Sequence, residues 1–201
     1  MSDHLLSDRD LDLIFRNARS YNAWSDKAVT KVELQAVYDV MRMGPTSATC
    51  SPARLVFCHS EEARAKLADC ASDGNKDKIK VAPVTVVIGQ DMEFYEKLPE
   101  LFPHTDAKSW FVGDDGKNED LISETAFRNS TLQGAYLMIA ARALGLDCGP
   151  MSGFDADAVT KAFFGGTSVK ANFICSLGHG TTENLFPRSP RLSFDEACEI
   201  K

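Results

Sequence analysis

Residues 121–144 read LISETAFRNSTLQGAYLMIAARAL and make the longest helical pattern in the chain. Gly145 follows at a position where helices commonly end, because glycine adopts the left-handed backbone conformation there without strain. The side chains expected on one apolar face are Leu132, Ala135, Tyr136, Ile139 and Ala143. A helix this long and this apolar needs cover on most of its surface, either from a sheet or from a partner chain.

Two apolar runs predict strands of a sheet. PVTVVIG at 83–89 is β-branched on both faces, which is typical of a buried central strand, and residues 169–177 predict a second strand. Capping boxes at Thr30–Glu33 and Ser193–Glu196 predict the starts of two helices. Shorter elements are expected as helices over 8–18, 60–70 and 155–164, as a strand over 55–58 and as a tight loop over 150–153. Because helices and strands do not alternate strictly, we expect a single α+β domain over residues 1–201.

The composition excludes several classes of protein. The chain has 201 residues, a net charge of -7, 44% hydrophobic residues and 25% charged residues, as ordinary globular proteins do. The acidic balance argues against a dedicated nucleic-acid binder, which needs a basic surface. No run approaches the roughly 18–20 apolar residues that span a bilayer, and the acidic N-terminus lacks the pattern of a secretory signal. We therefore expect a cytoplasmic protein with reduced thiols, bound to neither nucleic acid nor membrane.

The common catalytic motifs are missing from the sequence. It contains no P-loop, GxGxxG, HExxH or GxSxG pattern. The six cysteines include no CxxC pair, so no metal site is expected, and a cysteine nucleophile such as Cys50 remains an alternative because its histidine partner would meet it only in space. The histidines, none with a partner at metal-ligand spacing, are His4, His59, His104 and His179. For His59 we expect a surface or capping role.

Four separated segments offer hydrogen-bond donors for an anion or for a planar polar ring. They contain Arg19 and Ser20 after the first helix, Asn75 and Lys78 at the start of a short helix, the loop Pro150–Gly153, and Arg188 and Arg191 near the C-terminus. Taken singly, each cation is more often a solvated surface charge. The residues alone therefore leave both interpretations open.

The chain resembles the nitroreductase family of FMN flavoproteins over nearly its whole length. The stretches that carry the resemblance are GPTSATCSPAR (44–54), EFYEKLPELFPHTDAKSWF (93–111), ETAFRNSTLQGAYL (124–137), ALGLDCGPMSGFD (143–155) and PRLSFDEAC (190–198). The resemblance implies a nitroreductase-like α+β fold, with a central, mostly antiparallel sheet flanked by helices. It also implies an intertwined homodimer that binds FMN at its interface, uses NADH or NADPH, and extends its C-terminal segment across the partner subunit.

The resemblance also implies positions for the cofactor. Arg19 and Ser20 fall at the FMN phosphate and ribityl chain, and Arg188 and Arg191 fall at the phosphate. Asn22 stands where the family often has Arg, so this chain has one fixed positive charge fewer near the phosphate. Residues implied at the ring's polar edge and along the loop beside it are Asn75, Lys78, Pro150, Met151, Ser152 and Gly153. Residues implied to reach the flavin from the partner subunit are Pro45, Thr46 and Ser47, with Thr49 where the family usually has Asn.

The closest resemblance is to family members that reduce malonic semialdehyde to 3-hydroxypropionate in pyrimidine degradation. It implies a lid over the ring formed by residues 91–118, with Trp110 stacking on nicotinamide or substrate and His104, Lys108 or Arg128 holding a carboxylate. For Arg128, an ion pair with Glu124 one turn earlier is the stronger expectation. Because the cofactor carries hydride chemistry, no catalytic side chain is required. The alternatives are a broad NAD(P)H:quinone or nitro-compound reductase and a flavin-binding dimer that does not turn over.

Overall fold

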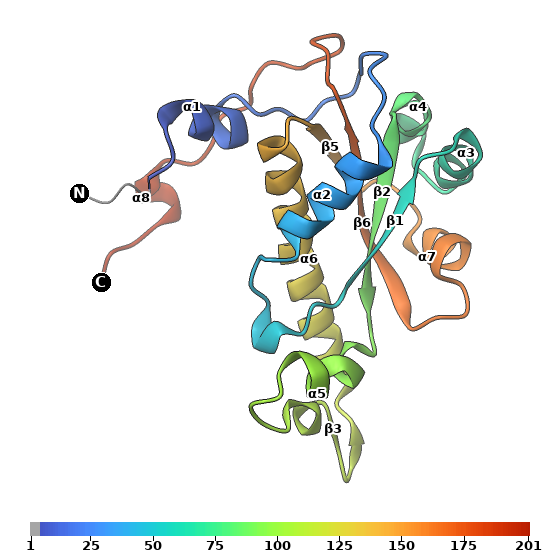
Figure 1. Cartoon of the computed structure of the whole chain (residues 1–201), viewed down its shortest axis with the longest axis vertical. Helices are drawn as coiled ribbons and strands as arrows, with labels where there is room; N and C mark the ends of the chain where they lie inside the picture. Colours follow the sequence, from blue (N-terminus) through green and yellow to red (C-terminus); the bar gives the residue numbers. More distant parts are fainter. Residues whose placement is uncertain (1–4) are drawn as a thin grey trace.

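The computed structural model describes residues 5–201, so His4 lies outside the described residues. Its centre is a four-stranded antiparallel sheet, and two layers of helices flank this sheet (Figure 1). The strands, in their order across the sheet, are β1 (Ala53–Cys58), β2 (Val84–Asp91), β6 (Val169–Gly178) and β5 (Asp147–Met151). The predicted α+β architecture is confirmed.

Strand β2 is the central strand that its β-branched sequence predicts. All eight of its residues are buried, with Val86 opposite Phe57 of β1 on one side and opposite Cys175 of β6 on the other. Strand β5 is an edge strand that the sequence analysis interprets as a loop over 150–153. Pro150 closes this short strand without disturbing the sheet, because an edge strand tolerates a residue without a backbone N–H.

Helices α2 (Lys31–Met41) and α6 (Glu119–Ala143) cover one face of the sheet (Figure 1). The helices on the other face are α3 (Glu61–Asp69), α4 (Asp73–Val81) and α7 (Ala156–Phe164). The predicted capping box of Thr30 and Glu33 starts α2, and Ser60 and Asp155 accept the first hydrogen bonds of α3 and α7. None of the described helices is long and apolar enough to cross a membrane.

Helix α6 buries a different face from the one that its large apolar residues predict. Its buried residues are Ile122, Thr125, Ala126, Asn129, Ser130, Gln133, Gly134, Leu137, Ala140 and Ala141. Leu132 is 43% exposed, Ala143 is exposed, and Ala135, Tyr136 and Ile139 are half-buried. Small residues face the sheet because they let the helix approach it closely. This chain therefore covers the predicted apolar face only in part and leaves Leu132 and Ala143 exposed.

A small lobe packs against the first turns of α6. It comprises 3₁₀ turns at Phe94–Lys97 and Ala107–Trp110, helix α5 (Leu98–Leu101), and the hairpin of β3 (Val112–Gly113) and β4 (Gly116–Lys117). Phe94, Tyr95 and Phe111 form its core together with Ile122 of α6. This lobe corresponds to the predicted excursion over residues 91–118.

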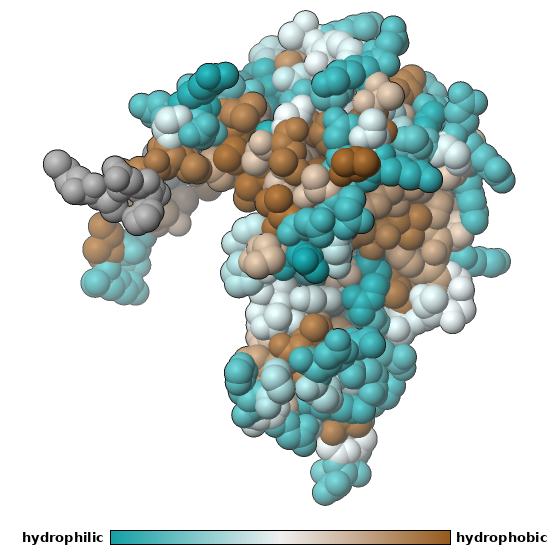
Figure 2. All heavy atoms as spheres, viewed as in Figure 1, coloured by the Kyte–Doolittle hydropathy of each residue, from teal (hydrophilic) through white to brown (hydrophobic). Residues whose placement is uncertain are grey.

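Two terminal arms, residues 5–18 and 182–201, extend to one side of the body (Figure 1). Helix α1 (Asp8–Leu11) continues into a π-helical turn that ends at Arg16, two residues before the end of the predicted helix. Helix α8 (Phe194–Ala197) begins with the predicted capping box of Ser193 and Glu196. Figure 2 shows apolar side chains gathered on the concave side between these arms and the body. Exposed large apolar residues of the arms and of α2 and α6 include Phe15, Tyr38, Leu132 and Phe194.

The close contact between α6 and β6 gives a stability prediction. A Cβ at Gly134 would lie 2.3 Å from the Phe173 ring, so Gly134→Ala must push the helix away from the sheet. We expect the free energy of unfolding in urea to fall by about 1–3 kcal/mol despite the higher helix propensity of alanine. The control is Gly113→Ala, where no atom lies within 4 Å of the added Cβ and the change should be small. Equal stability of the two variants would contradict this packing.

Candidate functional site

A cleft of about 470 Å³ lies beside the edge strand β5. Its walls come from the segment after the N-terminal helical turn, the last turn of α6, the end of β5, α4 and the C-terminal arm. Five cations line it, and they are Arg19, Lys78, Arg142, Arg188 and Arg191. We call this space the cationic cleft. Four of the five, all except Arg142, are predicted as site residues from the sequence. They come from separated segments of the chain, and the fold brings them together.

The segment that carries Arg19, Ser20 and Asn22 is fastened to the sheet edge. The backbone N–H of Tyr21 donates to the carbonyl oxygen of Cys148 at 3.0 Å. Gly149 permits this approach, because a Cβ there would lie 2.5 Å from the carbonyl oxygen of Tyr21. Burial raises the pKa of Tyr21, and the carboxylate of Asp147 raises it further, so this phenol stays neutral at physiological pH.

The C-terminal arm is tied to the same segment from the other side. The Arg19 guanidinium donates to the carbonyl oxygen of Phe186, and Arg188 Nη2 donates to the carbonyl oxygen of Ala18 at 2.9 Å. Arg191 donates to the carbonyl oxygens of Ser189 and Pro190. Within residues 5–201, no guanidinium of the cationic cleft has a carboxylate oxygen within 4.0 Å. The cleft therefore holds concentrated positive charge, which suits an anionic ligand.

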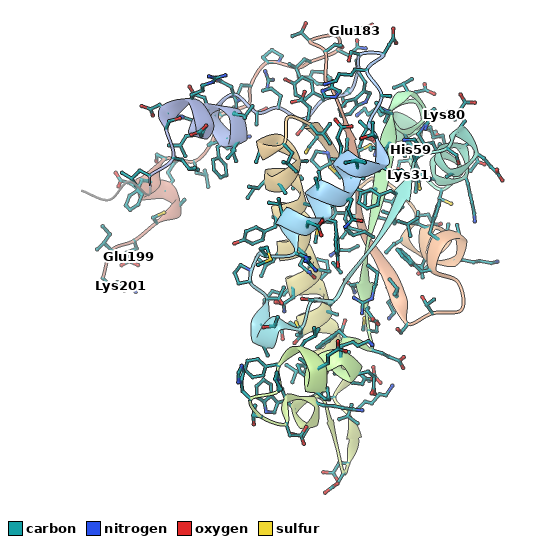
Figure 3. The ribbon with its side chains drawn as sticks, in the orientation of Figure 1. Lys31, His59, Lys80, Glu183, Glu199 and Lys201 are labelled. Atoms are coloured by element: carbon teal, nitrogen blue, oxygen red, sulfur yellow. The ribbon has the colours of Figure 1, made fainter. Side chains whose placement is uncertain are left out.

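A second cleft, of about 790 Å³, adjoins the first between α4 and the C-terminal arm. The two clefts share Lys78, Asn22 and the segment 185–187. Trp24 and Val81 give the second cleft apolar walls, and Asp77 and Glu183 give it acidic groups. Figure 3 shows Glu183 on the loop at the end of the molecule above the sheet.

The segments of Asn75 and Gly153 touch directly, as a shared site requires. Asn75 Nδ2 donates to the carbonyl oxygen of Gly153 at 3.0 Å, and a Cβ at Gly153 would lie 2.6 Å from that nitrogen. Pro150 lines the cationic cleft and Ser152 is exposed. Met151 instead packs into the core between the sheet and α3, α4 and α7, because alternate residues of β5 face opposite sides of the sheet.

The remaining predicted site residues lie at the opposite end of α6. Pro45, Thr46, Ser47 and Thr49 belong to the loop that precedes β1, and this loop packs beside the lobe (Figure 1). Two buried residues of α6 hold the loop: Asn129 Oδ1 accepts from the Ser47 N–H and Gln133 Oε1 accepts from the Ala53 N–H, both at 2.8 Å. Neither residue is among the predicted site residues, although polar residues on the inner face of a helix are a usable signal.

The loop before β1 is strained. Ala48, Thr49 and Ser51 have φ values of 47°, 52° and 41°, in the left-handed region that non-glycine residues rarely adopt. Strain of this kind persists only where surrounding contacts determine the conformation, and it gathers at functional sites. The buried hydrogen bonds from α6 provide those contacts.

The lobe carries an exposed aromatic group and an ion pair, and a second ion pair lies on the neighbouring helix α6. The Phe102 ring lies 5.1 Å from His104 and 6.4 Å from Trp110, whose side chain is half-exposed. Lys108 Nζ lies 2.6 Å from Glu96 Oε2, and Arg128 of α6 pairs with Glu124 as expected. In this chain, therefore, Lys108 and Arg128 are each engaged with a carboxylate of their own surroundings.

The alternative of a cysteine nucleophile finds no support in the geometry. Cys50 is 2% exposed among the aromatic residues of the lobe, and burial raises the pKa of its thiol to about 11. A thiol with this pKa stays protonated at neutral pH and is a poor nucleophile. His59 is exposed and its Nε2 lies 2.9 Å from the carbonyl oxygen of Val29, which fits a surface role, the first of the two roles expected for it. Within residues 5–201, no group of three or more potential ligands could hold a metal ion.

The fold and the cationic cleft together define an α+β protein with a cleft lined by cations at the edge of its sheet. The family model described as the nitroreductase family matches residues 15–180, which is most of the chain. The protein belongs to the nitroreductase family.

Similar proteins agree with this assignment. A relative from Stenotrophomonas maltophilia (strain R551-3), described as "Putative NADH dehydrogenase/NAD(P)H nitroreductase", is 58% identical over 198 residues, which cover 98% of each chain. Another, from Cupriavidus pinatubonensis, is 56% identical over 94% of this chain and 96% of its own. Among solved structures, a "putative nitroreductase in complex with FMN" from Exiguobacterium sibiricum has a TM-score of 0.82 at 19% identity and covers 100% of both chains. An enone reductase of gut-bacterial fatty acid saturation has a TM-score of 0.80 at 17% identity, over 98% of this chain and 99% of its own.

The environment of Cys50 predicts its reactivity. At pH 8 a thiol of pKa about 11 is ionised to only roughly one part in a thousand, so native Cys50 should resist iodoacetamide. Unfolding in guanidinium removes the burial that raises the pKa, so the same cysteine should then be labelled rapidly. Peptide mass spectrometry measures both rates. Rapid labelling of native Cys50 would restore the cysteine nucleophile as an explanation.

Proposed function

We propose that this protein is an FMN-dependent NAD(P)H oxidoreductase that works as a homodimer. The observation that carries the proposal is the cationic cleft, where Arg19, Lys78, Arg188 and Arg191 converge without a carboxylate partner within residues 5–201. The family membership and the FMN named for one structural neighbour support the same cofactor. The names of the relatives support NADH or NADPH as the hydride donor.

The residues of the cleft fit this cofactor. A phosphate monoester suits the guanidinium groups of Arg19, Arg188 and Arg191, and the Ser20 hydroxyl adds a donor beside them. Lys78 gives positive charge to the polar edge of the ring, while Asn75 holds the Gly153 backbone that would lie beside it. When bound, FMN supplies the hydride chemistry, so no protein nucleophile is required.

Three features of the chain support a homodimer. On α6 the apolar side chain of Leu132 is 43% exposed, the outer edge of β1 has no partner strand among the described residues, and the terminal arms extend away from the body (Figure 1). The lobe packs on Ile122 in the first turns of α6, whereas Arg142 lines the cationic cleft from the last turn, so the lobe would cover the cleft of another copy. Figure 3 shows Glu199 and Lys201 at the end of the C-terminal arm, well apart from the body.

We propose malonic semialdehyde as the second substrate, reduced to 3-hydroxypropionate in pyrimidine degradation. The resemblance in the sequence supports this choice, as does the lobe, whose Trp110 and His104 are exposed and would cover a partner's flavin. The alternative of a broad quinone or nitro-compound reductase is favoured by the ion pairs of the lobe and α6. Lys108 and Arg128, two of the three groups that the resemblance implies for the substrate carboxylate, already pair with Glu96 and Glu124.

The function is tested by an anaerobic reduction and reoxidation series on the purified protein. We expect yellow protein that carries FMN, loss of its visible flavin absorbance on adding NADH or NADPH, and recovery of the colour with malonic semialdehyde. A quinone and a nitroarene, added to separate reduced samples, are the comparison substrates. Recovery with these two alone would favour the broad reductase, and a flavin that NAD(P)H does not bleach would favour the non-catalytic dimer. A protein that binds no FMN after reconstitution would overturn the proposal.

The dimer is tested by placing a charge on the open face of α6. We expect Leu132→Glu to shift the protein from dimer to monomer in analytical ultracentrifugation and to lose bound FMN with it, because a buried unpaired carboxylate is costly at an interface. Lys161→Glu, which changes charge on exposed α7 at the other face of the sheet, is the control and should remain dimeric. A wild-type protein that sediments as a monomer while binding FMN would contradict the dimeric site.

A further inference from the structure

Arg142 is a cation of the cationic cleft that comes from the long helix. It lies in the last turn of α6 and lines the cleft together with Arg19, Arg188 and Arg191. Asn22 lines the same cleft and is neutral. The other cations arrive on a connecting segment, on α4 and on the C-terminal arm, so Arg142 alone reaches the cleft from the rigid layer that packs on the sheet.

The hydrogen bonds of Arg142 are incomplete within the described part of the chain. Its Nη1 donates to the carbonyl oxygen of Ile14 at 3.2 Å. Its Nε is fully buried and has no hydrogen-bond partner among the described residues. The nearby carboxylate of Asp147 accepts from the Gly180 N–H at 2.9 Å, and it forms no ion pair with Arg142 within residues 5–201.

Buried donors of charged groups rarely lack an acceptor, because without one no hydrogen bond offsets the free energy lost when water is removed from the donor. Other buried or half-buried arginines of this chain meet the rule: Arg54 pairs with Asp91 at 2.6 Å, and Arg64 donates to three backbone carbonyl oxygens. Arg142 does not meet the rule: its buried Nε–H has no acceptor among the described residues, and its guanidinium donates there only to the carbonyl oxygen of Ile14. The guanidinium lines the cleft and so keeps capacity for an acceptor that enters the cleft from outside the chain. In a cleft lined by four guanidinium groups and a lysine, that acceptor is an anion.

We propose that Arg142 binds the phosphate group of the cofactor and that it is a principal source of selectivity for FMN over flavins without a phosphate. This inference rests on the proposed function. It assigns to the C-terminal end of α6 a binding role that adds to the phosphate contacts of Arg19, Arg188 and Arg191. A plain structural role is the competing explanation, because a cation in the last turn of a helix also stabilises the helix dipole.

The test compares two flavins on the full-length apoprotein. Dissociation constants for FMN and for riboflavin, which lacks the phosphate, are measured from the quenching of flavin fluorescence at low ionic strength. The variants are Arg142→Gln, which removes the charge, and Arg142→Lys, which keeps the charge but loses the guanidinium fork. Lys161→Gln is the matched control, since it removes a cation from the last turn of α7, on the other side of the sheet.

We expect Arg142→Gln to weaken FMN binding about tenfold or more and to change riboflavin binding less than twofold. Arg142→Lys should weaken FMN binding by an intermediate factor and leave riboflavin binding unchanged. If Arg142→Gln does not fold, this variant alone tests whether Arg142 contacts the phosphate. The salt dependence of FMN binding should become shallower in Arg142→Gln, because one cation fewer contacts the phosphate. Lys161→Gln should change neither constant.

Equal losses for the two flavins, or unchanged FMN binding in a folded Arg142→Gln variant, would overturn the role of Arg142. These outcomes are distinct from failure of the proposed function. If the wild-type apoprotein binds neither flavin, the function itself is wrong. If the wild type binds FMN tightly while Arg142→Gln does so equally well, only the inference about Arg142 fails.

Discussion

The close packing of α6 on the central sheet is the contact on which the rest of the molecule depends. Gly134 meets the Phe173 ring with no room for a Cβ, and most of the other buried residues of the helix are small or polar, with Ile122 and Leu137 as the large apolar exceptions. Because the helix lies so near the sheet, its buried amides reach the backbone of the loop before β1. The same rigid helix carries Arg142 to the cationic cleft at its other end. One packing contact thus fixes both ends of the proposed site.

The length of α6 also separates those two ends. Its 25 residues span roughly 37 Å, at about 1.5 Å for each residue, so the lobe at one end cannot close over the cleft at the other. A flavin is much shorter than this distance. If the strained loop and the lobe contact the cofactor, as the family resemblance implies, they do so in a second copy of the chain. The open apolar face of α6 would then be the surface along which the two copies meet.

The sequence predicts the elements well and the orientation of α6 poorly. Capping boxes and β-branched runs locate local structure correctly because they depend on neighbours within a few residues, as at Thr30, Ser193 and β2. The buried face of α6 depends instead on the sheet that packs against it. A prediction from hydrophobic periodicity relies on large residues such as Leu132, and these are too bulky to fit between a helix and a sheet that lie this close together. Strand β5 is missed for a similar reason: its partner β6 defines it, while its own Gly-Pro sequence resembles a turn.

In the proposed phosphate site, the cleft would keep its positive charge although one of its residues differs from the family pattern. Asn22 stands where the family resemblance implies an arginine, which would leave the phosphate site one charge short. Arg142 enters the same cleft from an element far away in the sequence. A phosphate responds to the number and geometry of the cations around it, so the chain segment that supplies each one is free to vary. An acidic protein of net charge -7 can therefore select a dianionic ligand, because a few guanidinium groups lie within one cleft and no carboxylate within residues 5–201 neutralises them there.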